Sequence, residues 1–214
     1  MWDVETGKEV ATLKGHTGEV VSLHFNAEGD KVLTGSFDTT AKIWDTRSGE
    51  CIHTLDEHTG EISSTQFEFT GEFCATGSID RTCKIWDLGT GKCVDTLVGH
   101  LDEVLDISFN STGTKIVTAS ADNTARVYNV HTGTCTAILT GKTWNKIQSL
   151  IQKKIGHSGE ISKVSFNPQG TKIITASADC TARVWSAETG EELQVLEGHT
   201  DEIFSSAFNY EGDI

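Results

Sequence analysis

The chain has 214 residues, of which 36% are hydrophobic and 22% are charged, and its formal net charge is −14 at pH 7. This composition suffices for a buried core and excludes wholesale disorder. The excess of acidic residues argues against a surface for nucleic acid or for anionic membrane, because both need a field of Lys and Arg.

No apolar run approaches the roughly 20 residues of a membrane span, and the segment 1–15 contains no apolar signal core. The six cysteines show no pairing pattern, and three of them, at 51, 93 and 135, are evenly spaced along the chain. Equivalent positions in stacked units do not pair naturally, so we expect reduced thiols in an intracellular compartment. A zinc site is the alternative, but no paired Cys/His spacing supports it. We expect no cofactor and no metal.

Short runs rich in β-branched and aromatic residues alternate with polar turns along the chain. The first complete unit predicts strands over 20–25, 31–36, 41–45 and 50–55. The turns between them contain Gly, Asp, Ser or Thr, and the repeated units nowhere sustain the period of a helix. One unit is therefore predicted to be a four-stranded meander of hairpins.

The same unit recurs downstream in a fixed register. His16, His58 and His100 are evenly spaced, His157 follows after one longer interval, and the original interval then leads to His199. An aromatic residue follows each of the first four histidines at a constant offset, namely Trp44, Trp86, Tyr128 and Trp185. One four-stranded sheet cannot bury both of its faces alone, so the units must stack, and radial stacking gives a propeller.

Two dipeptides anchor each unit. Gly-His occurs at 15–16, 99–100, 156–157 and 198–199, and Trp-Asp occurs at 2–3, 44–45 and 86–87. The chain thereby resembles the WD-repeat β-propeller family. It departs from the signatures at Glu57, at Asn129 and at Ser186, which leaves the expected fold intact. We expect an all-β WD-repeat propeller with four complete four-stranded blades at about 15–56, 57–98, 99–140 and 156–197.

The ends and one insertion interrupt this register. Residues 1–3 match the end of a third strand, and residues 201–208 match a further first strand within a partial repeat at 198–214. We therefore expect a truncated piece of a larger propeller; the alternative is a four- or five-bladed ring closed by the two ends. Residues 141–155 form an inserted loop with apolar residues at the spacing of a short amphipathic helix. It is either a partner-binding loop or a tolerated insertion or gene-model error.

Each unit also repeats His, Ser, Asp and an aromatic residue at constant offsets. A catalytic triad needs one such set, and here the set occurs four times without a nucleophile-elbow motif. We interpret the sets as structural networks of mutually satisfied polar groups, which the family resemblance places between the turn before the first strand and the third strand. Tyr128 is predicted to alter the third network. The sets are His16, Ser36, Asp38 and Trp44; His58, Ser78, Asp80 and Trp86; His100, Ser120, Asp122 and Tyr128; and His157, Ser177, Asp179 and Trp185.

A carboxylate recurs at the entry to each first strand. By the family's geometry these glutamates lie on one rim together with apolar residues of the neighbouring turns and strands. An acidic rim with apolar spots suits a basic peptide or helix of a protein partner; the alternative is a solvated rim that keeps the protein soluble. The candidate rim comprises Glu19, Phe37, Glu61, Ile79, Glu103, Leu105, Glu160, Glu202 and Phe204.

The expected function is a non-catalytic scaffold for protein partners. The strings at 102–109, 159–167 and 198–213 resemble the members of the family that act as adaptors for outer-arm axonemal dynein. This resemblance implies dynein and an intraflagellar transport complex B subunit as partners, in the cytoplasm, cilium or flagellum, and basal body. The alternatives are another WD-repeat scaffold, such as a ubiquitin-ligase substrate receptor or a lissencephaly-type dynein regulator, and an enzyme with a propeller core. An enzyme would require one asymmetric polar cluster in the central channel, and the sequence shows none.

Overall fold

A computed structural model of the chain describes residues 1–140 and 156–212. It places sixteen β-strands in four separate antiparallel sheets, and the described residues contain no helix. The first two sheets consist of β1 Val20–Phe25, β2 Lys31–Ser36, β3 Ala41–Asp45, β4 Cys51–Leu55, β5 Ile62–Phe67, β6 Phe73–Ser78, β7 Cys83–Asp87 and β8 Cys93–Leu97. The other two consist of β9 Val104–Phe109, β10 Lys115–Ser120, β11 Ala125–Asn129, β12 Cys135–Leu139, β13 Ile161–Phe166, β14 Lys172–Ser177, β15 Ala182–Ser186 and β16 Glu192–Leu196.

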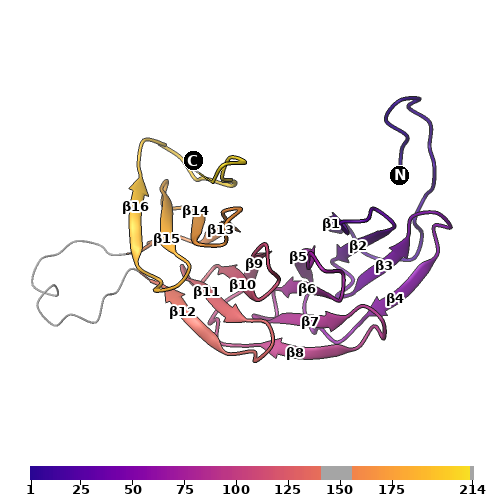
Figure 1. The fold of residues 1–214 in the computed structure, drawn as a ribbon, viewed down its shortest axis with the longest axis horizontal. Coiled ribbons are helices and arrows are strands. Elements are labelled where there is room, and N and C mark those ends of the chain that lie inside the picture. The colour runs from indigo at the N-terminus through magenta and orange to yellow at the C-terminus, as the bar shows by residue number, and fades with distance from the viewer. Residues whose placement is uncertain (141–155, 213–214) are drawn as a thin grey trace, which may run out of the picture.

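The sheets stand side by side around an arc and do not close into a ring (Figure 1). The first strands β1, β5, β9 and β13 line the inner side, and the fourth strands lie outermost. Within each sheet the strands pair in sequence order, so every connection is a hairpin. This architecture confirms the predicted all-β propeller of four four-stranded blades, which we number 1 to 4 in chain order.

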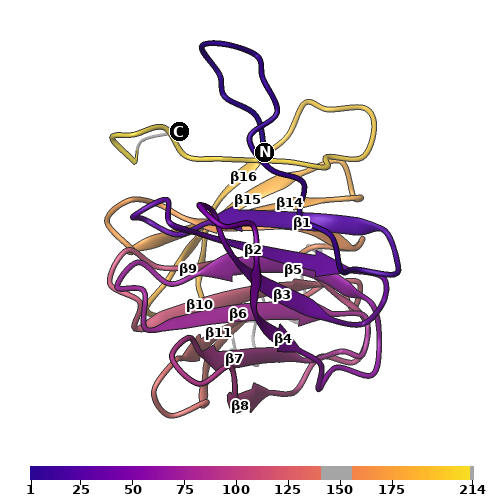
Figure 2. The ribbon, with the colours of Figure 1, turned by 90° about the vertical axis from the view of Figure 1, so that its right-hand side faces the viewer.

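The ends of the chain lie outside these four sheets. Trp2 and Glu9 form an isolated antiparallel bridge, and the segment around them projects away from the blades (Figure 2). Residues 201–208, expected as a first strand, form no ladder. Their contact with blade 4 includes one backbone hydrogen bond, from Ile203 N to Ser177 O at 3.1 Å. The predicted inserted loop at 141–155, with its amphipathic helix, lies outside the described residues.

The hydrophobic core lies between the blades. Leu33, Ala41 and Leu55 of blade 1 cluster with Cys74 and Trp86 of blade 2. The same arrangement recurs at the next two junctions, where each blade offers aliphatic residues and receives the aromatic residue of its neighbour. A single blade therefore buries its two faces only through its neighbours, as the repeat argument requires.

Side chains of the inner strands form hydrogen bonds between neighbouring blades. An inner strand pairs on one side only, so alternate N–H groups need another acceptor. The preceding blade supplies it: Thr65 N donates to Ser22 Oγ at 2.9 Å and Phe109 N donates to Gln66 Oε1 at 2.6 Å. At the last junction Val164 N donates to Asp106 Oδ2 at 3.0 Å. These contacts fix each blade against the next along the inner side of the arc.

Candidate functional site

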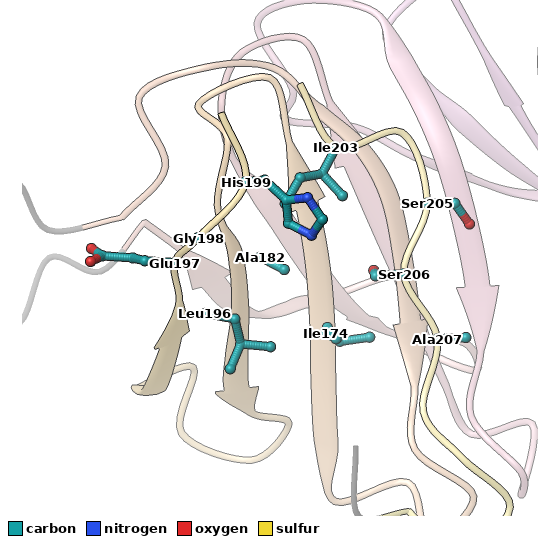
Figure 3. Close-up of a pocket in the computed structure, with 10 residues that line it drawn as sticks. All are labelled: Ile174, Ala182, Leu196, Glu197, Gly198, His199, Ile203, Ser205, Ser206 and Ala207. Atoms are coloured by element: carbon teal, nitrogen blue, oxygen red, sulfur yellow. The ribbon is translucent and has the colours of Figure 1, made fainter. Parts of the chain in front are cut away.

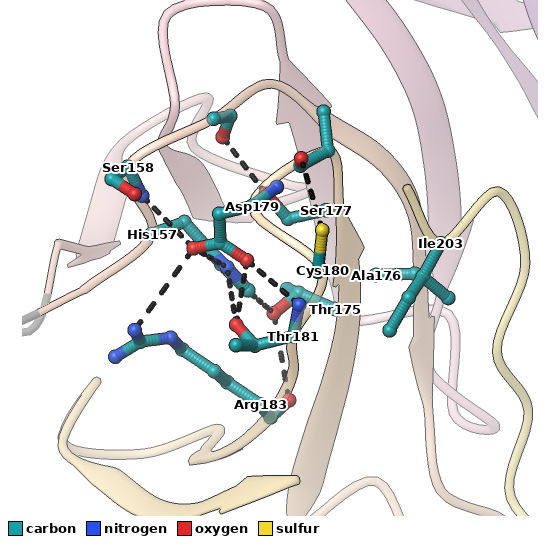
Figure 4. Close-up of polar contacts among 12 residues, drawn as sticks. His157, Ser158, Thr175, Ala176, Ser177, Asp179, Cys180, Thr181, Arg183 and Ile203 are labelled. Carbon is teal, nitrogen blue, oxygen red and sulfur yellow. Dashed lines mark hydrogen bonds and ion pairs between the residues drawn. The ribbon is translucent and has the colours of Figure 1, made fainter. Parts of the chain in front are cut away.

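In each blade, a linear network of polar side chains links the second and third strands, and the turn between them, to the segment before the first strand. In blade 4, His157 Nδ1 lies 3.0 Å from Asp179 Oδ2, and His157 Nε2 lies 2.6 Å from Thr175 Oγ1 (Figure 4). Trp185 Nε1 donates to the same hydroxyl at 2.9 Å. The only donor sequence that satisfies all four groups runs from the indole N–H to Thr, from the Thr O–H to Nε2, and from Nδ1–H to the carboxylate.

Blades 1 and 2 repeat this network almost unchanged. The distances from His Nδ1 to Asp Oδ2 are 2.8 Å for His16 and 2.7 Å for His58. The hydroxyl between imidazole and indole belongs to Thr34 and Thr76, which sequence analysis did not single out. Their register could have revealed them, because Thr34, Thr76, Thr118 and Thr175 follow the same spacing as the first four histidines, with the longer interval in the same place.

The serines of the predicted sets end the second strands and bond to backbone groups of the neighbouring turns. Ser78, Ser120 and Ser177 are buried, and their hydroxyls donate to the carbonyl oxygens of Gly60, Asp102 and Gly159 at 3.0–3.1 Å. Each also accepts the backbone N–H of the Asp two residues later, and Ser36 accepts that of Asp38 at 3.1 Å. Each serine, at the end of the second strand, therefore bonds to the backbone of the turn. In blades 1, 2 and 4 the Thr two residues earlier lies between the histidine and the indole.

The third network differs at its aromatic end, where Tyr128 stands in place of Trp. His100 keeps both of its partners, at 2.9 Å to Asp122 and 2.6 Å to Thr118. The Tyr128 hydroxyl instead donates to Val98 O at 3.1 Å, and burial raises the pKa of Tyr128. Thr118 therefore lacks the indole donor that the equivalent threonines receive.

The acid of the Trp-Asp signature has a separate role. Asp45 Oδ1 accepts the N–H groups of Arg47 and Ser48 at 2.9 and 2.7 Å and so closes the turn into the fourth strand. Where the signature changes, the replacement also supplies an oxygen: Asn129 Oδ1 accepts from His131 N at 3.0 Å, and Ser186 Oγ accepts from Thr189 N at 3.2 Å. Both departures thus preserve the turn.

The electrostatics of the network favour an ionised carboxylate and a neutral imidazole. Burial raises the pKa of Asp179, but hydrogen bonds from Thr181, Ser158 N and His157 outweigh burial and lower that pKa to about 2. Burial lowers the pKa of His58 and of His157, more strongly than Asp80 and Asp179 raise it. Because these groups satisfy one another, the network holds the strands of the blade together.

The candidate rim residues lie on the edge where first strands begin. The carbonyl oxygens of Glu19, Glu61, Glu103 and Glu160 accept the N–H groups of Phe37, Ile79, Ala121 and Ala178 at 2.9–3.0 Å. The structure therefore brings together the glutamate and the turn residue of each blade. Ile79, Leu105 and Glu61 are half-buried, while Phe37, Phe204 and the other four glutamates are exposed. Within the described residues, none of the five carboxylates has an ion-pair partner.

A pocket of about 320 Å³ opens on the far face of blade 4 (Figure 3). Its lining includes Ile174, Ala182 and Leu196, which occupy the same repeat positions as Leu33, Ala41 and Leu55. At the first junction those positions pack against Cys74 and Trp86 of the next blade. The pocket is therefore a blade-packing surface. The described residues include no cluster of three His, Cys, Asp or Glu side chains arranged for a metal ion.

None of the six cysteines forms a disulfide. Burial raises the pKa of the Cys74 and Cys83 thiols, which keeps them protonated in the core. In the described part of the chain, no helix has the length and apolar character that crossing a membrane requires.

The sequence pattern of the WD domain, G-beta repeat, matches residues 7–45, 49–87, 91–129 and 144–186. The chain belongs to this WD40 repeat family, whose members bind other proteins. This result and the four blades confirm the family resemblance that the Gly-His and Trp-Asp dipeptides indicated.

Similar proteins share shorter stretches with the chain. Dynein assembly factor with WD repeat domains 1 from Danio rerio is 54% identical over 53 residues, which is 25% of this chain and 13% of that protein. Its Homo sapiens counterpart is 52% identical over 69 residues, or 32% of this chain and 17% of that protein. The Lissencephaly-1 homolog of Caenorhabditis briggsae is 39% identical over 61 residues, or 28% of this chain and 16% of that protein. The matched stretches span less than a fifth of these relatives.

Proposed function

We propose that the chain is a non-catalytic scaffold that binds proteins through its acidic rim and serves as an adaptor in the assembly and transport of outer-arm axonemal dynein. One observation supports the scaffold function. The repeated His, Asp and Thr groups hydrogen-bond to one another, while the rim glutamates form no ion pair among residues 1–140 and 156–212. The partner that fits such a rim is a basic segment with apolar side chains, since the rim offers carboxylates beside Phe37, Ile79 and Phe204.

The finer assignment rests on the likeness to the dynein assembly factor. Identity of 52–54% over 53–69 residues supports it, beside 39% for the lissencephaly homolog. The proposed partners are axonemal dynein and an intraflagellar transport complex B subunit, and the proposed setting is the cytoplasm and the cilium. A lissencephaly-type scaffold is the second candidate, favoured by that weaker match.

Co-precipitation from ciliated-cell lysate tests both levels of this proposal. The wild-type chain is expected to recover an outer-arm dynein heavy chain or a transport complex B subunit. A variant with Glu103→Gln, Glu160→Gln and Glu202→Gln is expected to lose at least nine-tenths of either. Glu28→Gln, an exposed change in the turn at the other end of blade 1, is the control and should recover both.

The outcomes separate the two levels. Recovery of neither protein by the wild-type chain contradicts the dynein assignment. Undiminished recovery by the rim variant contradicts the rim as the binding surface and leaves the dynein assignment standing.

A further inference from the structure

One cation stands at the second position of each third strand, and in three blades it is paired within its own blade. These cations are Lys42, Lys84, Arg126 and Arg183. Lys42 Nζ donates to Thr54 Oγ1 at 2.9 Å. Lys84 Nζ donates to Thr96 Oγ1 at 3.0 Å and lies 3.9 Å from Glu57 Oε2.

Arg183 of blade 4 is paired as well. Its Nη1 donates to Glu192 Oε2, and its Nη2 lies 4.0 Å from Asp179 Oδ2. Pairing within the blade is therefore the ordinary state of this cation, whether it is Lys or Arg.

Arg126 of blade 3 departs from this pattern. Both acceptors that Lys84 uses are replaced at the equivalent positions, Thr96 by Ile138 and Glu57 by Gly99. Among the described residues, Arg126 has no hydrogen-bond or ion-pair acceptor for its side chain, whereas Arg183 has Glu192 and Asp179 for its Nη groups. The buried Nε is unpartnered in both arginines. Gly99 also makes room for the guanidinium, because a Cβ atom there would lie 2.7 Å from Nη1. An external carboxylate would supply the acceptor that the terminal Nη groups of Arg126 lack among the described residues.

Three exposed apolar residues lie across the sheet from this cation or within two residues of Gly99, which adjoins its guanidinium. Val98 is 64% exposed, Leu101 is 77% exposed and Ile138 is 45% exposed. Ile138 pairs directly with Arg126 across β11 and β12, and Val98 O accepts the Tyr128 hydroxyl two residues further along the strand. Blade 2 has polar residues at the same three positions, namely Asp56, Thr59 and Thr96. We call Val98, Leu101, Arg126 and Ile138 the seam patch, since they lie where blade 3 meets the end of blade 2.

We propose that the seam patch binds a partner segment in which a carboxylate is flanked by aliphatic side chains. A guanidinium presents a planar fork that matches a carboxylate with two parallel hydrogen bonds. The apolar neighbours favour aliphatic flanks. Asp122 and Glu103 close by in the sequence, in a chain of net charge −14, favour a singly charged carboxylate over a phosphate dianion. This proposal rests on the proposed scaffold function and adds to it a second contact of opposite charge preference.

Two short peptides test the chemistry directly. Acetyl-Leu-Asp-Leu-amide is titrated into the full chain while the side-chain Nε–Hε resonances of the arginines are followed by NMR. The Asp peptide is expected to shift the Arg126 resonance along a saturable curve. The Asn counterpart is expected to bind at least about tenfold more weakly, because the charge-assisted pair is lost. Arg183, already paired with Glu192, is the internal control and should not move.

A consensus variant provides the matched control. Arg126→Lys with Ile138→Thr rebuilds the Lys–Thr pair of blades 1 and 2, so the blade should fold while peptide affinity falls at least about tenfold. Arg126→Gln is a second variant with the same expectation. The proposal is overturned if the Arg126 resonance does not shift, if Asp and Asn peptides bind equally, or if the consensus variant binds as the wild type does. A basic Lys-Leu peptide, added separately, reports on the rim, so loss of one binding event identifies which proposal has failed.

Discussion

At the scale of single residues, the repeated histidines act as connectors in a chain of hydrogen bonds. Each imidazole receives a Thr hydroxyl on one nitrogen and gives its other N–H to an Asp carboxylate. A buried polar group without a hydrogen-bond partner lowers the stability of the folded state, so the network stabilises the blade only when all of its partners are present. This explains why the same set recurs in every blade, which a catalytic role would not require.

The contribution of the central threonine to the free energy of unfolding should increase with the number of its hydrogen-bond partners. Thr76→Val removes the acceptor of Trp86 Nε1 and the donor to His58 Nε2, and we expect it to lower the free energy of unfolding by about 2–3 kcal/mol. Thr118→Val loses the contact with His100 and a long contact with Arg126 O at 3.5 Å, but no indole donor, and should cost about 1 kcal/mol. Urea denaturation of both variants measures the difference. An equal decrease in the free energy of unfolding for both variants would contradict the hydrogen-bond path from the indole through the threonine hydroxyl to the imidazole.

Acid should destabilise the protein in two stages. Burial lowers the pKa of His58 and His157 below the ordinary 6.5, so below that pH the unfolded chain binds more protons and the folded state loses stability. Despite the opposing effect of burial, hydrogen bonds lower the pKa of Asp80 and Asp179 below 3.8, which adds a second loss below about pH 4.

Urea unfolding at pH 7.5, 5.5 and 3.5 follows this dependence. We expect the free energy of unfolding to fall at each step. A free energy that stays constant between pH 7.5 and 5.5 would show that the buried imidazoles do not titrate as stated.

At the scale of strands, neighbouring blades are fastened by inner-strand side chains. Asp106 on β9 is the most connected of these: besides Val164 N, its carboxylate accepts Lys163 Nζ at 3.1 Å and Ser64 Oγ at 3.0 Å. It therefore touches both adjacent blades. Burial raises the pKa of Asp106, and the contacts with Lys163, Val164 N and Ser64 offset only part of that rise.

Removing this carboxylate should loosen one junction selectively. Asp106→Ala is expected to lower the free energy of unfolding by about 1–3 kcal/mol and to speed exchange of the Val164 amide at least tenfold. Asp106→Asn retains an acceptor and should give an intermediate result. Ser22→Ala is the matched control at the first junction, where exchange of Thr65 N should respond instead. If the Val164 amide exchanges as slowly in the Ala variant as in the wild type, Asp106 does not hold blades 3 and 4 together.

Much of this element-level structure was predictable from local patterns. The first three strands of blade 1 coincide with the predicted 20–25, 31–36 and 41–45, because polar turns bound each apolar run. The role of Thr34 was missed because hydroxyl partners depend on how strands pair across a sheet. The inner-strand contacts, such as Ser22 with Thr65, were missed because they depend on how two sheets are placed side by side.

At the scale of the whole molecule, the four blades share one edge with a repeated carboxylate, and blade 3 alone carries the seam patch. Repetition accounts for the networks, the turns and the cores between blades. Two features are not explained by repetition: the rim glutamates, which have no ion-pair partner in the described part of the chain, and the seam patch, where blade 3 departs from its neighbours. We therefore propose that the architecture and the binding of partners depend on different residues.

The most direct test is one set of binding isotherms with a basic amphipathic peptide of alternating Lys and Leu. The account predicts that neutralising Glu103, Glu160 and Glu202 to Gln weakens binding at least about tenfold while the unfolding midpoint stays within a few degrees. Thr76→Val, measured below its own unfolding midpoint, should lower stability and leave the affinity unchanged. The opposite pattern, in which the rim variant binds normally and the Thr76 variant loses the peptide while still folded, would contradict the account.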